Sequence, residues 1–127
     1  MEPELYKEHI LYHYRNPRNK YALVGADVVT HEVNALCGDE ITLYAHTDEQ
    51  GIITTKSFTG DGCAISQAAA SLLTDYAVGK HVKDLQHMTP QDMEQLLGVP
   101  LSIVRARCAL LPIHALQKYT LEPISHA

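Results

Sequence analysis

The sequence has no cluster of basic residues and no long apolar run. Its formal net charge is −5, and like charges form no run, whereas a nucleic-acid-binding domain usually carries a clustered basic face. No apolar stretch approaches the roughly 20 residues that a membrane-spanning helix needs. We therefore expect a protein that contacts neither nucleic acid nor membrane.

Cysteine is scarce, because the sequence contains only Cys37, Cys63 and Cys108. An odd number of separated cysteines cannot form a complete disulfide framework and fits a reducing compartment better. Residues 1–4, Met-Glu-Pro-Glu, do not begin a secretory signal peptide. We expect a cytoplasmic protein.

The composition is that of one soluble globular domain. The chain has 127 residues, of which 46% are apolar and 20% are charged, as in ordinary single domains. It has no internal repeat and no low-complexity linker. A chain of this length can bury a core without covalent cross-links, so we expect one domain over residues 1–127.

Hydrophobic periodicity predicts strands in the middle of the chain and helices around them. Alternation and β-branched residues predict strands at residues 29–33, 41–45 and 52–58, with a turn at residues 48–51 that makes the last two a hairpin. Helical spacing predicts helices that cover residues 5–14, 65–78, 90–97 and about 102–119. Because strands and helices are segregated, we expect an α+β fold with an antiparallel sheet.

Pro112 interrupts the last predicted helix, because proline has no N–H to donate to the carbonyl of Cys108. Either the helix kinks just after Cys108, or its regular part begins near Pro112. In both cases we expect Cys108 to lie at a helix irregularity, where its backbone and side chain are more accessible.

The first cysteine belongs to the segment Cys37-Gly38-Asp39, between two predicted strands. Glycine allows a tight turn, so that a thiolate and a carboxylate two residues apart can face one point. Thiolates suit zinc and iron–sulfur clusters, and zinc also accepts a carboxylate. Cys37 and Asp39 are therefore candidate ligands.

The other two cysteines also have neighbours that favour the thiolate. Cys63 follows a glycine-rich loop and precedes a predicted helix, whose first amides stabilise negative charge. Cys108 follows Arg105 and Arg107, which favour a thiolate when they lie close. No Cys-x-x-Cys pair is present, so the residues alone leave open a shared metal or cluster site and three unrelated cysteines.

His9 and His13 are four residues apart, a spacing with which a helix can bind metal. Histidine pairs on a helix are more often solvated or involved in capping. We therefore expect no metal at this pair.

The sequence resembles the IscU/SufU (NifU N-terminal-like) family of iron–sulfur cluster assembly proteins along nearly its whole length. Four segments carry the resemblance, and the last two of them, which contain Cys63 and Cys108, have the SufU form. The matching segments are residues 12–19 (Tyr-His-Tyr-Arg-Asn-Pro-Arg-Asn), 34–39 (Asn-Ala-Leu-Cys-Gly-Asp), 60–66 (Gly-Asp-Gly-Cys-Ala-Ile-Ser) and 105–110 (Arg-Ala-Arg-Cys-Ala-Leu).

The resemblance implies a single assembly domain with a three-stranded antiparallel sheet packed against helices. It implies that Cys37, Asp39, Cys63 and Cys108 converge on one site, which holds zinc, or iron in a 2Fe–2S cluster. It also implies two kinds of partner, a cysteine desulfurase and downstream iron–sulfur acceptor proteins.

Several positions depart from the family pattern. Ala35 stands where the family usually has proline, and Arg107 stands where IscU-type members have histidine. Residues 98–102 do not match the Leu-Pro-Pro-Val-Lys segment of IscU-type members, and residues 79–98 are too short for the SufU-type insertion. The chain combines SufU-like motifs with an IscU-like length.

Two functions within the family therefore stay open. As a scaffold, the protein accepts sulfur from the desulfurase and assembles and transfers a 2Fe–2S cluster. As a zinc-dependent sulfur acceptor, it activates the desulfurase without holding a cluster. In either role we expect Cys108 to be the persulfide acceptor, with Cys37 as the runner-up.

Two further functions lie outside the family. One is a small zinc protein that only binds partners. The other is a cysteine hydrolase, which needs a fixed His–Cys pair that no motif here supplies. We find no self-contained catalytic site in the sequence.

Overall fold

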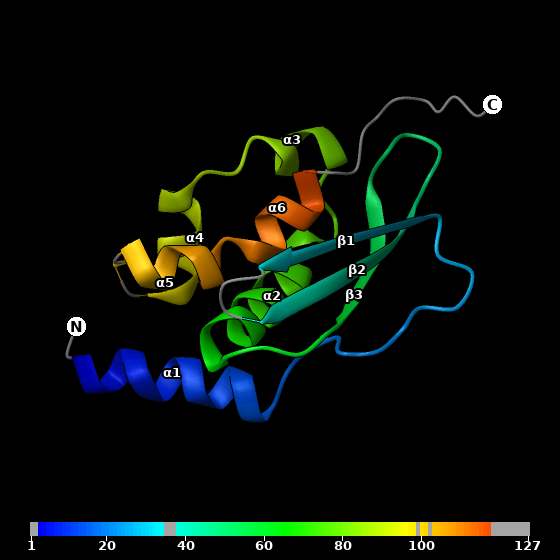
Figure 1. Cartoon of the computed structure of the whole chain (residues 1–127). Coiled ribbons are helices and arrows are strands. Elements are labelled where there is room, and N and C mark those ends of the chain that lie inside the picture. The colour runs from blue at the N-terminus through cyan, green and yellow to red at the C-terminus, as the bar shows by residue number, and fades with distance from the viewer. Residues whose placement is uncertain (1–2, 35–37, 99, 102, 118–127) are drawn as a thin grey trace.

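The computed structural model describes residues 3–34, 38–98, 100–101 and 103–117. In these residues no helix is long and apolar enough to cross a membrane. The elements in chain order are α1 (Pro3–Arg15), β1 (Val28–Asn34), β2 (Asp39–Thr47), β3 (Ile53–Thr59), α2 (Ala64–Ala77), α3 (Val82–Gln86), α4 (Pro90–Leu97), α5 (Ile103–Ala109) and α6 (Leu111–Gln117) (Figure 1).

The three strands form one antiparallel sheet in the order β1-β2-β3. Asn34 lies opposite Asp39 in the first pair of strands, and Leu43 lies opposite Phe58 in the second. The predicted α+β fold with a three-stranded antiparallel sheet and flanking helices is confirmed.

The turn between β2 and β3 is built around Asp48. Its carboxylate Oδ1 accepts hydrogen bonds from the backbone N–H groups of Gln50 (2.8 Å) and Ile52 (2.9 Å). Gly51 follows with a φ of 86°, a left-handed conformation that favours glycine. The predicted turn at residues 48–51 is confirmed, and it sets the register of the hairpin.

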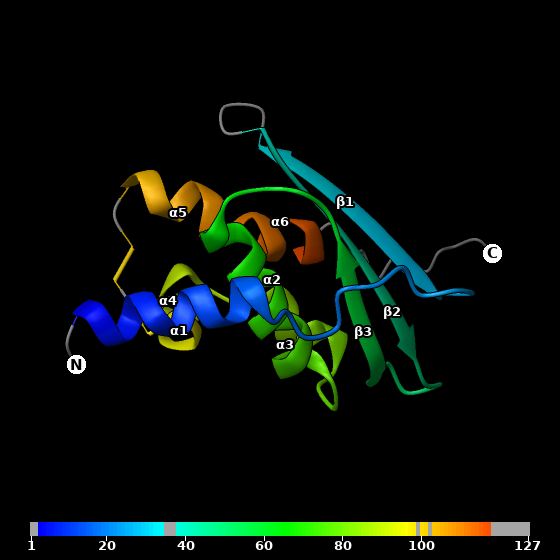
Figure 2. The same ribbon diagram turned by 90° about the horizontal axis from the view of Figure 1, so that it is seen from below.

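Helices gather on one side of the sheet (Figure 2). Helix α2 packs on β3, and α6 packs on β1 and β2. The buried face of β2 is made of Ile41, Leu43 and Ala45, which are at most 2% exposed. Each large apolar side chain buried in this way contributes roughly 1.5–3 kcal/mol.

The helix ends follow the sequence signals in two cases. Helix α4 begins with a capping box, in which Thr89 and Asp92 each accept a hydrogen bond from the other's backbone N–H. Helix α2 ends at Ala77, shortly before Gly79, whose φ is 91°. Helix α3 was not predicted, because its N-cap is His81, which accepts a hydrogen bond through Nδ1 from the Lys83 N–H.

The predicted C-terminal helix is interrupted just after Cys108, as Pro112 predicted, and two helices occupy its place. Helix α5 ends at Ala109 and α6 begins at Leu111, so that Pro112 falls in the first turn of α6. The missing N–H of proline costs nothing there, since first-turn amides have no partner within the helix. Cys108 consequently lies in the last turn of α5.

Helix α1 packs along α2 and carries the two histidines. The His13 ring is 7% exposed and lies 3.4 Å from the Ser71 hydroxyl, while His9 lies 3.4 Å from the carbonyl of Leu96. Burial lowers the pKa of His13. The expectation of a solvated or capping pair is therefore wrong for His13, which is a helix-packing residue.

Lys56 is buried, whereas the other lysines whose burial the structure describes are not. Lys56 of β3 lies opposite Ala45 and is 3% exposed, and its ammonium group has no anionic partner among the described residues. Burial lowers the pKa of Lys56 from 10.5 to about 8. This shift corresponds to a cost of about 3 kcal/mol for the charged form.

We predict that Lys56→Met stabilises the protein by roughly 1–3 kcal/mol at about pH 7, because the buried charge is removed. The folded pKa lies below the unfolded value of 10.5, so the penalty is complete below about pH 8 and disappears as the pH rises to 10.5. Urea unfolding of both proteins across this range measures the difference. Lys83→Met, at an exposed lysine, is the control and should change little. An advantage of Lys56→Met that does not shrink with rising pH would contradict the assignment.

Candidate metal centre

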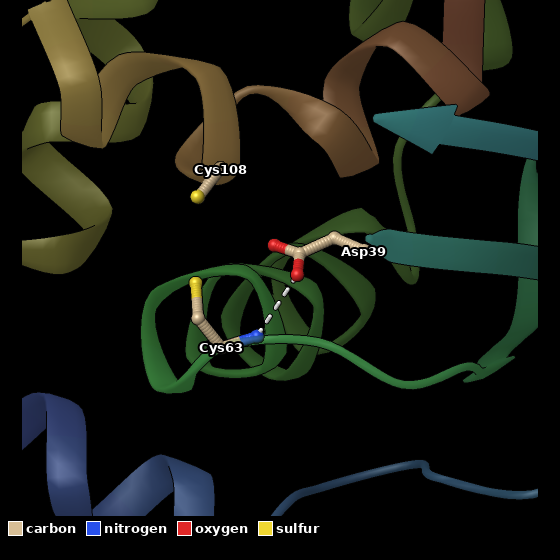
Figure 3. A group of neighbouring side chains, drawn as sticks. All are labelled: Asp39, Cys63 and Cys108. Carbon is tan, nitrogen blue, oxygen red and sulfur yellow. Dashed lines mark hydrogen bonds between the residues drawn. The ribbon is translucent and has the colours of Figure 1, made fainter. Parts of the chain in front are cut away.

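Three residues from distant parts of the chain meet at one end of the sheet. Asp39 is the first residue of β2, Cys63 is the N-cap of α2, and Cys108 lies in the last turn of α5. One ligand atom from each side chain lies within 4.8 Å of those from the other two. The side chains point toward one another from three separate elements (Figure 3).

Asp39 is buried and only half satisfied. Its side chain is 2% exposed, and Oδ1 accepts a hydrogen bond from the Cys63 backbone N–H at 3.2 Å. The other oxygen, Oδ2, is buried and has no hydrogen-bond partner among the residues that the structure describes. An unpaired buried carboxylate oxygen is costly, so its position points to a cation or another donor that completes the site.

Two glycines allow the loop before α2 to pass close to β2. A Cβ on Gly60 would collide with the backbone carbonyl of Glu40. A Cβ on Gly62 would lie 2.8 Å from the Asp39 Cγ and 2.5 Å from the Ser66 Oγ. The contact between loop and strand is completed by a hydrogen bond of 2.8 Å from the Glu40 N–H to the Asp61 carbonyl.

The two described thiols differ in access. Cys63 is exposed, whereas Cys108 is 8% exposed. The expectation that the helix break leaves Cys108 accessible is therefore wrong. The break does exist at residue 110, but the Cys108 side chain is buried and points toward the side chains of Asp39 and Cys63 (Figure 3).

The remaining predicted site residues are only partly described. Cys37 lies outside the described residues, as does the side chain of Arg105. Arg107 is exposed. Gly38 is described, and its φ of 72° agrees with a tight turn immediately before Asp39.

Sequence reasoning missed two groups beside Cys63. The Ser66 hydroxyl is fully buried and donates to the Cys63 carbonyl at 3.1 Å. Gln67 is 2% exposed, and neither polar atom of its side-chain amide has a hydrogen-bond partner among the described residues. The signal available in the sequence was the polar pair Ser66-Gln67 at the start of an otherwise alanine-rich helix.

The donor set fits a thiophilic metal. Two sulfur atoms and a carboxylate oxygen are ligands that zinc accepts, and thiolates hold iron–sulfur clusters. Asp39 Oδ2, which has no hydrogen-bond partner in the described part of the chain, also agrees with a bound cation. Hard cations such as magnesium prefer sites made of oxygen only.

A family model described as the NifU-like N terminal domain matches residues 5–121. The chain belongs to this family. The resemblance inferred from the sequence motifs is thereby confirmed.

Two curated relatives cover most of the chain. The "Zinc-dependent sulfurtransferase SufU" of Bacillus subtilis is 34% identical over 90% of this chain and 88% of its own length. The "Iron-sulfur cluster assembly enzyme IscU" of Drosophila melanogaster is 34% identical over 89% of this chain and 74% of its own length. A relative named SufU and a relative named IscU therefore have the same sequence identity to this chain.

A solved structure agrees with the fold. The putative iron–sulfur cluster assembly scaffold protein for the SUF system from Fervidobacterium islandicum has a TM-score of 0.78 and 25% sequence identity. The alignment covers 92% of this chain and 98% of that one. The arrangement of sheet and helices is thus that of a known member of the family.

We predict that Gly62→Ala weakens zinc binding at least about tenfold, because the new Cβ displaces the Asp39 carboxylate and the Ser66 hydroxyl. Competition with a chromophoric chelator measures the affinity. Gly25→Ala is the matched control, since Gly25 has a φ of 71° and an added Cβ would contact nothing. The control should lose about 1 kcal/mol of stability and keep its zinc affinity. Equal zinc affinities of the two variants would contradict the steric argument.

Proposed function

We propose that this protein accepts sulfur from a cysteine desulfurase, assembles a 2Fe–2S cluster at Cys37, Asp39, Cys63 and Cys108, and passes the cluster to acceptor proteins. The observation that carries the proposal is the meeting of Asp39, Cys63 and Cys108 within 4.8 Å. The names of the relatives support the same reaction class. A site made of thiols also favours a reducing compartment, the cytoplasm.

The donor set suits a cluster that is cargo rather than a permanent cofactor. Iron–sulfur clusters are normally held by four thiolates. Here one of the four proposed ligands is a carboxylate, which is harder and leaves iron more readily than a thiolate. We therefore infer that the site holds a cluster firmly enough for assembly and weakly enough for release.

Sulfur must arrive from a partner, because the sequence carries no cofactor-binding signature with which to extract it from cysteine. We propose that a thiolate of this chain attacks the outer sulfur of the desulfurase persulfide. A new S–S bond then forms on the acceptor, while the S–S bond in the desulfurase breaks and leaves its cysteine as a thiolate. This transfer balances without an external oxidant. Reducing the transferred sulfur to the sulfide of a cluster takes two further electrons per sulfur, which an external electron donor must supply.

A second function is favoured by one specific relative. The Bacillus subtilis protein is named as a zinc-dependent sulfurtransferase, and zinc with three thiolates and one carboxylate is a closed tetrahedral site. In this alternative, zinc occupies the same residues and no cluster forms. One ligand must leave before its sulfur can accept the transferred atom.

We predict that the anaerobically purified and reconstituted protein contains two irons and two sulfides per chain. Cys37→Ser, Cys63→Ser and Cys108→Ser should each lose most of this content, because the three thiolates share one site. Metal and sulfide analysis measures it. One zinc without sulfide would instead support the alternative. Unchanged metal content in two of the three variants would refute the shared site.

We predict that the sulfur is delivered to Cys108. Cys108 is 8% exposed in the isolated protein, so α5 must move when the pyridoxal-phosphate desulfurase binds. Alkylation of the isolated protein should therefore modify Cys63 faster than Cys108. After mixing with the desulfurase and labelled cysteine, peptide mapping should find the persulfide on Cys108.

Cys108→Ser is the control for this mapping, and it should lose the label. Label on Cys63 alone would contradict the prediction and would show that the more exposed thiol accepts the sulfur. Clusters that form with no label on the protein would show that sulfur arrives by another route.

A further inference from the structure

A buried hydroxyl contacts Cys63, the most exposed of the three described candidate ligands. Ser66 lies one helical turn after Cys63 on α2 and is fully buried. Its Oγ donates to the Cys63 carbonyl at 3.1 Å and lies 3.9 Å from the Cys63 Sγ, within hydrogen-bonding distance for sulfur. One side chain thus contacts both the backbone and the sulfur of the same cysteine.

The hydroxyl also lies next to the second ligand. A Cβ on Gly62 would be 2.5 Å from the Ser66 Oγ and 2.8 Å from the Asp39 Cγ. The hydroxyl and the carboxylate therefore both lie against Gly62. Asp39 in turn accepts the Cys63 N–H. Two side chains therefore hold Cys63 in place. Ser66 contacts the carbonyl and the sulfur of Cys63, and Asp39 accepts the hydrogen bond from the backbone N–H of Cys63.

We propose that Ser66 is a positioning residue for Cys63, whose hydroxyl orients the sulfur toward the metal or cluster and donates a hydrogen bond to it in the bound state. This role rests on the proposed site. A hydroxyl is suited to it because it can both accept and donate. It accepts from the thiol of Cys63, and it can turn its hydrogen to the sulfur once that sulfur is a ligand.

The competing explanation is a purely local one. Serine within a helix often donates to a backbone carbonyl three or four residues earlier, without any functional role. That explanation accounts for the bond to the Cys63 carbonyl. It predicts that removal of the hydroxyl affects the stability of α2 and leaves the bound metal unchanged.

Ser71 provides a matched control on the same helix. It is also fully buried, and its Oγ accepts a hydrogen bond of 2.8 Å from the Arg18 N–H. Its Oγ also lies 3.4 Å from the His13 Nδ1, and none of its hydrogen bonds in the described part of the chain involves Asp39, Cys63 or Cys108. Ser71→Ala therefore removes a buried, hydrogen-bonded serine hydroxyl without touching the site.

The test uses Co²⁺ as the metal probe, because its thiolate complexes absorb by charge transfer from sulfur to metal. Ser66→Ala should bind Co²⁺ about tenfold to a hundredfold more weakly than the parent, as expected when a group that orients a ligand is lost. Its charge-transfer band should shift to longer wavelength, since a sulfur without a hydrogen bond gives up electron density more easily. Ser71→Ala should keep both the affinity and the band of the parent. Ser66→Thr, which retains a hydroxyl, should restore the band position in whatever fraction folds.

The outcomes separate this inference from the proposed function. A parent protein without any charge-transfer band would overturn the thiolate site and the role of Ser66 with it. A normal parent together with an unchanged band and affinity in Ser66→Ala would overturn the role of Ser66 alone. Equal losses in Ser66→Ala and Ser71→Ala would assign the effect to helix stability and would also overturn it.

Discussion

The hydrogen bond from the Cys63 N–H to the Asp39 carboxylate joins the sheet to the central helix. Cys63 is the N-cap of α2 but gives the helix no side-chain cap of its own. Asp39, from the start of β2, supplies the acceptor instead at 3.2 Å. A carboxylate at a helix N-terminus is favourable because the free amides there carry partial positive charge. The capping of α2 and the geometry of the candidate site therefore depend on the same bond.

Cys108 reaches the site by a different route. It is carried by α5, a short helix that is separated from α6 by the break at residue 110. Pro112 makes that break compatible with helical structure on both sides. The site thus has two parts. Asp39 at the start of β2 and Cys63 at the start of α2 are joined by a hydrogen bond, whereas Cys108 lies on a separate helix of seven residues. A helix of this length has little stability of its own and depends on its packing.

Local signals predicted much of this structure, and the failures have physical causes. Alternation predicted the strands, and Thr89-Pro90 predicted the start of α4, because those signals act within a few residues. The burial of Cys108 was not predictable, since it depends on how α5 packs against elements far away in sequence. Helix α3 was missed because histidine is not among the usual N-cap residues. The grouping of Asp39, Cys63 and Cys108 came from resemblance to a family, because their spacing alone left unrelated cysteines as an alternative.

Asp39 has two oxygens with different tasks, and this division bears on how a cluster could leave. Oδ1 accepts the Cys63 N–H, while Oδ2 is buried and no described residue donates a hydrogen bond to it. If Oδ2 is the oxygen that contacts iron, its release breaks no bond that holds β2 to α2. In the proposed function, exchange of the Asp39 ligand is then a step of release that leaves β2 joined to α2, and the bonds from the three thiolates to the cluster must break as well.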